Sequence, residues 1–458
     1  MHNFSAAQLH ALYAAKKLSP VEATRAVLAN IAAWEPHLCA TYALDGEAAL
    51  AAARESEARW MGGTPLGALD GVPAMIKENI ATRGTPTPMG TAASLLVPAA
   101  ADAPPAARLR EAGAIILGKT TMPDYGMLSS GLSSFHPLTR NPWDLAKNPG
   151  GSSSGAAAGV AAGYGPLHVG TDIGGSVRLP AGWCGIFALK PSQGRVPIDP
   201  NYIGRVAGPM TRTVEDAALM MEVLALPDRR DAMALPYQKL DWRAMERDVK
   251  GLRIGLWLKA GCGMAVEPDV RAAVEAAAAR FAGAGAIVEP LKPFLTPHML
   301  DGLDLFWRQR ALAEITALPE GRREKILPFI RQWAEGARGT SGAALFDGFS
   351  QIMAMRSAAH AAFAGVDYVL SPTAPLPAFA AGLPCPANDP ARPFGHIGFT
   401  IAFNMSDQPA ASVNCGYTAE GMPVGLQITG QRFDDVGVLQ IARAWERMRG
   451  VQRAWPEA

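Results

Sequence analysis

Two serines that each follow a pair of glycines are the residues of this chain best placed to do chemistry. Ser152 lies in residues 150–155, which read GGSSSG, and Ser176 lies in residues 170–180, which read GTDIGGSVRLP. Because glycine has no side chain, the backbone N–H groups beside these serines can come close to a reacting oxygen. Backbone donors that bind a developing oxyanion usually make the largest single contribution to the rate of acyl transfer. The two motifs therefore predict an acyl-transfer site.

A serine hydroxyl is a poor nucleophile until a neighbouring base takes its proton, and a lysine is the best candidate for that base. The eight histidines stand in no context typical of a catalytic triad, and the G-x-S-x-G elbow is absent around Ser176. Lys77 follows the short apolar run Val72–Ile76, which predicts a buried strand. Burial lowers the pKa of a lysine, so the amine of Lys77 can be neutral and accept a proton.

These residues resemble the amidase signature family. The two serine motifs match the long core pattern of that family, including the spacing between Ser152 and Ser176. The resemblance runs from about Leu66 to Gly430 and is weakest between 220 and 360. It includes, besides the core, the segments KEN at 77–79, GKT at 118–120, NPW at 141–143, GPM at 208–210, SPT at 371–373 and GMPVGLQ at 421–427.

The resemblance implies a role for each part of the site. Ser176 would be the nucleophile, Lys77 the base, and Ser152, preceded by a cis peptide bond, would relay the proton between them. Arg178 is expected to pair with a carboxylate near the site, and neither a metal nor a cofactor is expected. The oxyanion would be bound by the backbone N–H groups of Ile173, Gly174, Gly175 and Ser176, the acyl pocket would be lined by Gly126 and Met127, and the site would be supported by Ser153, Thr171, Asp172 and Arg178.

The order of predicted elements favours an α/β fold. Helix, turn and strand follow one another from Ala107 to Leu117, and a strand, helix and strand follow between 252 and 288, which indicates βαβ crossovers. With the resemblance, we expect the amidase-signature fold: a single large mixed β-sheet covered on both faces by helices. Residues 1–458 are interpreted as one amidase domain, with a helical N-terminal segment (1–60), a signature core (66–215) and a variable, helix-rich, substrate-shaping region (290–360).

The composition argues against several classes of partner. Apolar residues make up 49% of the chain and charged residues 18%, which is typical of a protein with a large buried core. The net charge of +1 gives no reason to expect nucleic acid or a membrane as partner. The five cysteines are scattered without a C-x-x-C pair, and no signal peptide or membrane-spanning run is seen. We therefore expect a cytoplasmic protein with a small-molecule substrate, without nucleic acid or membrane as partner. Because homodimers are common in the family that the chain resembles, a homodimer is a possible assembly.

Details of the motifs favour a stand-alone amidase of broad scope. Leu179 follows Arg178 at a position where the glutaminase-type A subunits of tRNA-dependent amidotransferases typically carry glutamine, and residues 406–409 read SDQP where the family usually has a Gly-Leu-Pro-Ala-like stretch. Abundant Met, Phe and Trp between 290 and 360 indicate an apolar pocket. The predicted substrates are amides, with aryl amides (anilides), esters and carbamates (urethanes) within reach. The alternatives are the glutaminase-type component of an amidotransferase complex and a non-catalytic binding protein on the same fold.

Overall fold

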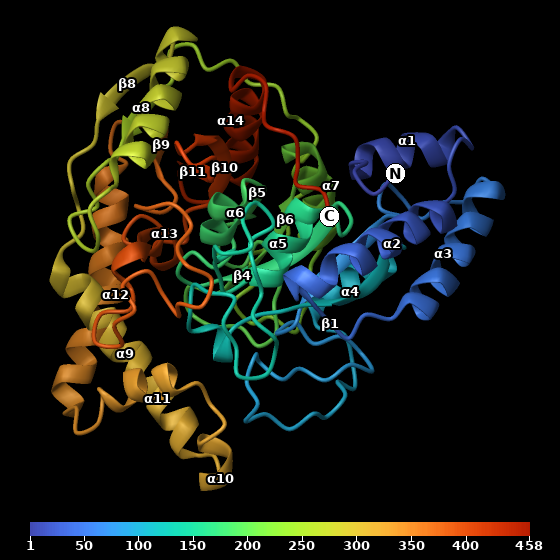
Figure 1. Cartoon of the computed structure of the whole chain (residues 1–458). Helices are drawn as coiled ribbons and strands as arrows, with labels where there is room; N and C mark the ends of the chain where they lie inside the picture. The colour runs from blue at the N-terminus through green and yellow to red at the C-terminus, as the bar shows by residue number, and fades with distance from the viewer.

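One mixed sheet of eleven strands runs through the molecule, and helices cover both of its faces (Figure 1). The computed structural model describes all 458 residues. The strand order is β1-β3-β2-β4-β6-β5-β10-β11-β9-β7-β8, which confirms the predicted α/β fold class. The strands are β1 (Thr41–Tyr42), β2 (Pro73–Lys77), β3 (Ile115–Thr120), β4 (Leu167–Asp172), β5 (Phe187–Lys190), β6 (Val206–Thr211), β7 (Arg253–Leu256), β8 (Ile287–Pro290), β9 (Tyr368–Pro372), β10 (Ala410–Tyr417) and β11 (Pro423–Gly430).

The helices begin where the sequence provides capping groups. Ser5 and Ser19 each form a capping box, the second followed by a proline in the first turn. The α-helices are α1 (Ala6–Ala14), α2 (Pro20–Leu38), α3 (Gly46–Met61), α4 (Pro104–Glu111), α5 (Ser154–Ala162), α6 (Arg178–Cys184), α7 (Val214–Leu224), α8 (Pro268–Gly283), α9 (Pro297–Thr316), α10 (Glu320–Arg323), α11 (Pro328–Glu335), α12 (Gly342–Ala362), α13 (Ile401–Met405) and α14 (Asp435–Met448). None of them is long and apolar enough to span a membrane.

Two βαβ units supply two of the parallel strand pairs of the sheet. Helix α4 connects the parallel neighbours β2 and β3, and α8 connects the parallel neighbours β7 and β8, as predicted. Strand β2 also pairs in parallel with β4, so the carboxyl ends of β2 and β4 lie at the same edge of the sheet. Lys77 is the last residue of β2 and Asp172 the last of β4. The topology therefore brings two distant segments of the chain to one place.

The alternation of side chains along β2 decides which face Lys77 serves. Ala74 and Ile76 belong to the large core under α1, α4, α7, α8 and α14, whereas Met75 packs on the opposite face with α2, α3 and α5. Successive side chains of a strand point to opposite faces, so Lys77 lies on the face of Met75. That face is the one covered by α5, whose preceding loop contains Ser152.

Helices α9 to α12 lie at the opposite end of the molecule from α1 to α3 (Figure 1). They confirm the prediction that residues 290–360 are rich in helix, and Trp307 and Trp333 pack in their shared core. The segment bounds 1–60, 66–215 and 290–360 within one amidase domain stay a prediction.

Candidate active site

Ser152 lies on a tight loop directly before α5. The peptide bond between Gly151 and Ser152 is cis, as the family resemblance implied. Every residue of α5 is buried, and the helix is built almost entirely from alanine and glycine. A Cβ atom on Gly155 would lie 2.2 Å from the carbonyl oxygen of Ala40 and 2.5 Å from the backbone nitrogen of Thr121. The run of small residues thus lets α5 pack closely enough to place Ser152 over the end of β2.

The amine of Lys77 contacts two successive serines of this loop. Lys77 Nζ lies 2.8 Å from Ser152 Oγ and 3.0 Å from Ser153 Oγ. It also donates to the carbonyl oxygen of Thr171 at 3.4 Å, and Ser153 Oγ donates to the same oxygen at 3.2 Å. Asn79 holds the Thr171 hydroxyl through a 3.0 Å hydrogen bond from Nδ2. The end of β2 and the end of β4 are therefore joined through these contacts.

The surroundings of Lys77 favour its neutral form. The side chain is fully buried. Burial is the main cause that holds the pKa of Lys77 well below its usual range, and the positive charge of Arg205 adds to it, against the opposing charges of Asp172 and Glu78. A neutral amine within hydrogen-bond distance of a hydroxyl can accept its proton.

Ser176 lies on the loop between β4 and α6, and Asp172 shapes that loop. Asp172 Oδ1 accepts a hydrogen bond from the Gly175 N–H at 2.8 Å, and Oδ2 accepts one from the Val177 N–H at 3.1 Å. The Ser176 hydroxyl makes no hydrogen bond within the chain, and both Ser176 and Ser152 line the same cavity. The nucleophile candidate is thus open to a substrate from that cavity.

Three of the four N–H groups predicted to bind the oxyanion have no hydrogen-bond acceptor in the chain. The N–H groups of Ile173, Gly174 and Ser176 donate to no group of the chain, whereas the Gly175 N–H is bound to Asp172. Gly175 has a φ of +124°, and a Cβ atom there would lie 2.6 Å from Thr400 Oγ1. The prediction that Gly175 is a free donor therefore needs correction. A glycine is required at position 175 because the backbone there is left-handed and because the loop packs closely against Thr400.

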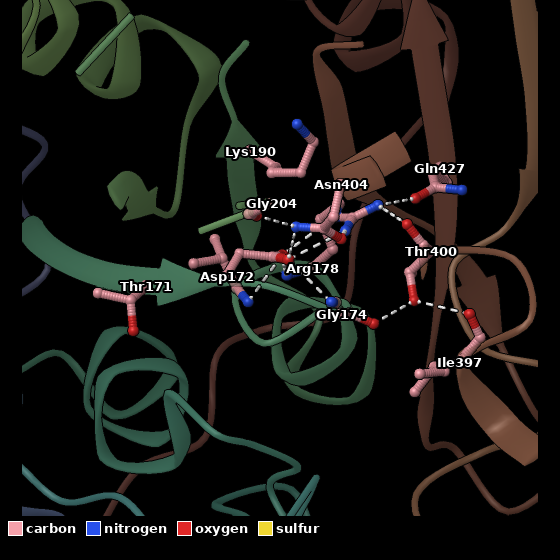
Figure 2. Close-up of polar contacts among 12 residues, drawn as sticks. Thr171, Asp172, Gly174, Arg178, Lys190, Gly204, Ile397, Thr400, Asn404 and Gln427 are labelled. Atoms are coloured by element: carbon pink, nitrogen blue, oxygen red, sulfur yellow. Dashed lines mark hydrogen bonds and ion pairs between the residues drawn. The ribbon is translucent and has the colours of Figure 1, made fainter. Parts of the chain in front are cut away.

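A fully buried ion pair of Asp172 and Arg178 supports the nucleophile loop (Figure 2). Arg178 Nε and one terminal nitrogen each donate to the carboxylate at 3.0 Å. The other donors of Arg178 reach Asn404 Oδ1 at 2.6 Å, the Thr400 carbonyl at 3.0 Å and Gln427 Oε1 at 2.7 Å. Burial alone would raise the pKa of Asp172, but the Arg178 guanidinium and the hydrogen bonds hold it well below its usual range. Arg178 thus pairs with a carboxylate, as expected.

We expect Arg178→Met to destabilise the protein strongly. The change leaves the Asp172 carboxylate charged and buried without its partner, which typically costs about 3–5 kcal/mol. Urea unfolding of the variant and the wild type, followed by circular dichroism, measures the difference in the free energy of unfolding. Arg59→Met, which breaks a partly exposed pair with Asp70, serves as the comparison. A loss for Arg178→Met below that of Arg59→Met would contradict the expectation.

A cavity of about 370 Å³ opens in front of the two serines. Of the residues predicted to shape it, Gly126 and Met127 do line it, and a Cβ atom on Gly126 would lie 3.2 Å from Ser152 Oγ. Thr171, Asp172, Ile173 and Gly174 line it as well, whereas Lys77, Ser153, Gly175 and Arg178 lie behind its wall. Lining residues that the sequence interpretation did not identify are Asn79, Met89, Tyr125, Leu128, Ser129, Pro200, Asn201, Tyr202, Arg205, Trp307, Arg310, Phe394 and Ile397.

Comparison with known proteins places the chain in a family. A family model described as Amidase matches residues 22–439. The A subunit of the glutamyl-tRNA(Gln) amidotransferase of Myxococcus xanthus is 37% identical over 96% of this chain and 96% of its own length. The subunit of the same name from Symbiobacterium thermophilum is 36% identical over 99% of this chain and 98% of its own length. A bacterial aryl acylamidase of the amidase signature family has a TM-score of 0.90 at 31% identity, covering 97% of this chain and 96% of that chain.

The fold, the site and these matches define an enzyme of the amidase type. The chain belongs to the amidase signature family, as its motifs implied.

The prediction of a stand-alone amidase acting on broad amides, anilides, esters and carbamates is wrong, because curated relatives matched over almost the whole chain are amidotransferase A subunits. The structure explains why Leu179 and residues 406–409 wrongly indicated a stand-alone amidase. Leu179 is 1% exposed and does not line the cavity. Its identity therefore does not indicate which substrate the cavity binds. The stretch 406–409 does not line the cavity either: Ser406 bonds to Gln408, and Asp407 pairs with Arg432.

The expectation that no nucleic acid is involved is also wrong on the same finding, since the names of those relatives include a tRNA. The argument rested on the net charge of +1. A total charge does not describe local patches on a surface, and it says nothing of other proteins that bind alongside the chain.

Proposed function

We propose that this chain is the glutamine-hydrolysing component of a tRNA-dependent amidotransferase, in which ammonia released from the glutamine side chain is passed to an aminoacylated tRNA. The observation that carries the proposal is the match to two glutamyl-tRNA(Gln) amidotransferase A subunits at 37% and 36% identity over nearly full length. The site supports it, because hydrolysis of a side-chain amide is an acyl transfer to serine followed by transfer to water.

In this proposal Ser176 attacks the amide carbon, and its proton passes through Ser152 to the neutral amine of Lys77. The 2.8 Å separation of Lys77 Nζ and Ser152 Oγ supports the relay. The C–N bond of the tetrahedral intermediate then breaks, and the same relay returns a proton to the nitrogen, which leaves as ammonia. Water attacks the acyl-enzyme, the Ser176 ester bond breaks, and glutamate is released with the proton back on Ser176.

Electrostatic stabilisation of the oxyanion is assigned to the free N–H groups of Ile173, Gly174 and Ser176. Asp172 and Arg178 keep these groups in place, and Gly126 and Met127 line the space for the acyl part. The role of Lys77 agrees with its burial, since a charged ammonium could not act as a base.

The proposal includes partners that the sequence interpretation excluded. The chain would act beside the other subunits of the amidotransferase, and the acceptor of the ammonia is a glutamyl-tRNA. All five cysteines are free, which agrees with a reducing, cytoplasmic compartment.

The test is reconstitution. The chain, purified together with the remaining subunits of the Myxococcus xanthus amidotransferase, is given L-glutamine, glutamyl-tRNA(Gln) and ATP with Mg²⁺, because the γ-carboxylate of the glutamyl group must be activated before ammonia can replace its oxygen. We expect glutamate and glutaminyl-tRNA(Gln) to form in equal amounts, and the same subunits without this chain to form neither. Release of ammonia from other amides but none from glutamine, in the presence and absence of the other subunits, would contradict the proposal.

A further inference from the structure

The cavity of the candidate active site contains an arginine that has no ion pair. Arg205 follows the loop 200–204 and lines the cavity, and its guanidinium makes one hydrogen bond within the chain, to the carbonyl oxygen of Pro200. No carboxylate of the chain forms a salt bridge with it. Its remaining N–H groups are therefore available to a ligand in the cavity.

A second arginine and a tyrosine hydroxyl lie at the same part of the cavity wall. Arg310 of α9 lines the cavity, and its guanidinium carbon lies 4.1 Å from the centre of the Tyr202 ring. Its Nε is bound to Glu314 at 2.9 Å. The hydroxyl of Tyr202 is buried beside the Arg310 guanidinium but makes no well-formed hydrogen bond in the chain. A buried hydroxyl without a well-formed hydrogen bond, and N–H groups of Arg205 that have no acceptor in the chain, indicate that something else satisfies them.

The charges of this region favour an anion. Burial is the main cause that lowers the pKa of Arg205 to about 10, and the nearby charge of Arg310 adds to it, against the opposing charge of Asp199. The one carboxylate that lines the cavity, Asp172, is already held by Arg178 and Asn404. Arg310 is paired with Glu314, so Arg205 is the cation of the cavity wall without an ion pair, and an anionic ligand would compensate its charge.

We infer that Arg205, together with Arg310 and the Tyr202 hydroxyl, binds a carboxylate of the substrate while the amide lies at Ser176. Guanidinium groups bind carboxylates with a geometry that suits two parallel hydrogen bonds. The inference rests on the proposed function and deepens it: in glutamine the bound group is the α-carboxylate. Met127, Trp307 and Ile397 line the same cavity and offer apolar contacts to the methylene groups between the two ends.

The same arrangement implies that the α-ammonium group of glutamine is not selected. No carboxylate of the cavity wall remains free to pair with it, since Asp172 is occupied. The des-amino analogue of glutamine, 4-carbamoylbutanoate, should therefore be hydrolysed at least as efficiently as glutamine. Pentanamide, in which a methyl group replaces the carboxylate, should be a poor substrate.

The experiment measures ammonia release from glutamine, 4-carbamoylbutanoate and pentanamide by the chain in its reconstituted complex. For the wild type we expect kcat/KM to be about 10- to 100-fold higher for 4-carbamoylbutanoate than for pentanamide, the range of a charge-assisted hydrogen-bond pair. Arg205→Met should reduce this ratio at least tenfold, and Arg205→Lys, which keeps the charge but not the two parallel hydrogen bonds, should reduce it less. Arg25→Met, on the exposed surface of α2, controls for the loss of one positive charge.

A binding measurement separates the inference from the proposed function. Glutarate, the product of the des-amino amide, is titrated calorimetrically into the wild type, Arg205→Met and Arg25→Met. We expect binding to the wild type and Arg25→Met, and a dissociation constant at least tenfold higher for Arg205→Met. If glutarate binds in this way but glutamine is not hydrolysed, the proposed function fails and the anion site stands. If the wild type does not bind glutarate, or Arg205→Met lowers kcat/KM equally for all three amides, the inference is overturned.

Discussion

Replacing Ser176 with alanine is expected to lower kcat for amide hydrolysis by about 10,000-fold or more. The serine oxygen is the atom that forms the acyl-enzyme, and removing the nucleophile of a serine hydrolase leaves the activity due to substrate binding and the oxyanion donors. The side chain makes no hydrogen bond in the chain, so its loss should hardly change the fold. Steady-state ammonia release and circular dichroism of the variant give the two measurements.

Reaction with a fluorophosphonate probe tests the same serine without a substrate. Mass spectrometry of a digest should find the adduct on Ser176 of the wild type and no adduct in Ser176→Ala. Ser350→Ala, on the exposed face of α12, is the matched control and should react like the wild type. An unlabelled wild type would favour the non-catalytic binding protein, and an active Ser176→Ala would remove the assignment of the nucleophile.

Local sequence signals were enough to predict many of the elements. The capping boxes at Ser5 and Ser19 involve only neighbouring residues, and α1 and α2 each begin directly after one of them. Short apolar runs such as Val72–Ile76 became buried strands because only the interior of a sheet covers a strand on both faces. The motif residues Lys77 and Ser152 meet through long-range packing, because β2 pairs with β4 and α5 packs closely over the end of β2, and only the family resemblance predicted their contact.

The substrate end of the cavity could not be predicted in this way. Tyr202, Arg205 and Arg310 come from a loop and a helix about a hundred positions apart, and only tertiary packing brings them together. Nor does a sequence tell where an N–H group points, which is why Gly175 was expected to bind the oxyanion although its amide is held by Asp172. Inference of the substrate from Leu179 failed for the same reason, because its side chain points into the core.

Buried lysines make the stability of this protein depend on pH. The pKa of Lys77 lies well below its usual range in the folded state, and burial with the nearby charge of Arg178 lowers the pKa of Lys190 to about 7 (Figure 2). Unfolded, both lysines would keep a pKa near 10.4, so between the two pKa values the unfolded chain binds more protons. The free energy of unfolding contributed by these groups therefore rises with pH from the folded pKa to about 10.4, and below the folded pKa it has its lowest value.

Lys77→Met is expected to reduce kcat by about 1,000- to 10,000-fold, because the proton of Ser176 then has no base to receive it. Methionine is apolar and of similar length, so the variant avoids the cost of burying an amine, and its free energy of unfolding should equal or exceed that of the wild type. In the wild type, kcat/KM should fall as the pH drops through the pKa of Lys77, since a protonated amine cannot accept a proton. Lys190→Met should remove part of the pH dependence of the free energy of unfolding. It should keep the acid limb of the activity profile, which is the fall of kcat/KM at low pH.

The two variants together distinguish a base from a structural lysine. Urea unfolding between pH 6 and 9 measures stability, and ammonia release over the same range measures activity. A purely structural Lys77 predicts that Lys77→Met loses stability and activity together, and that the residual activity keeps the acid limb. If Lys77 is the base, Lys77→Met should be a stable protein whose residual activity no longer falls at low pH. Full activity of a folded Lys77→Met would contradict the relay through Ser152, because no other amine lies within hydrogen-bond distance of that hydroxyl.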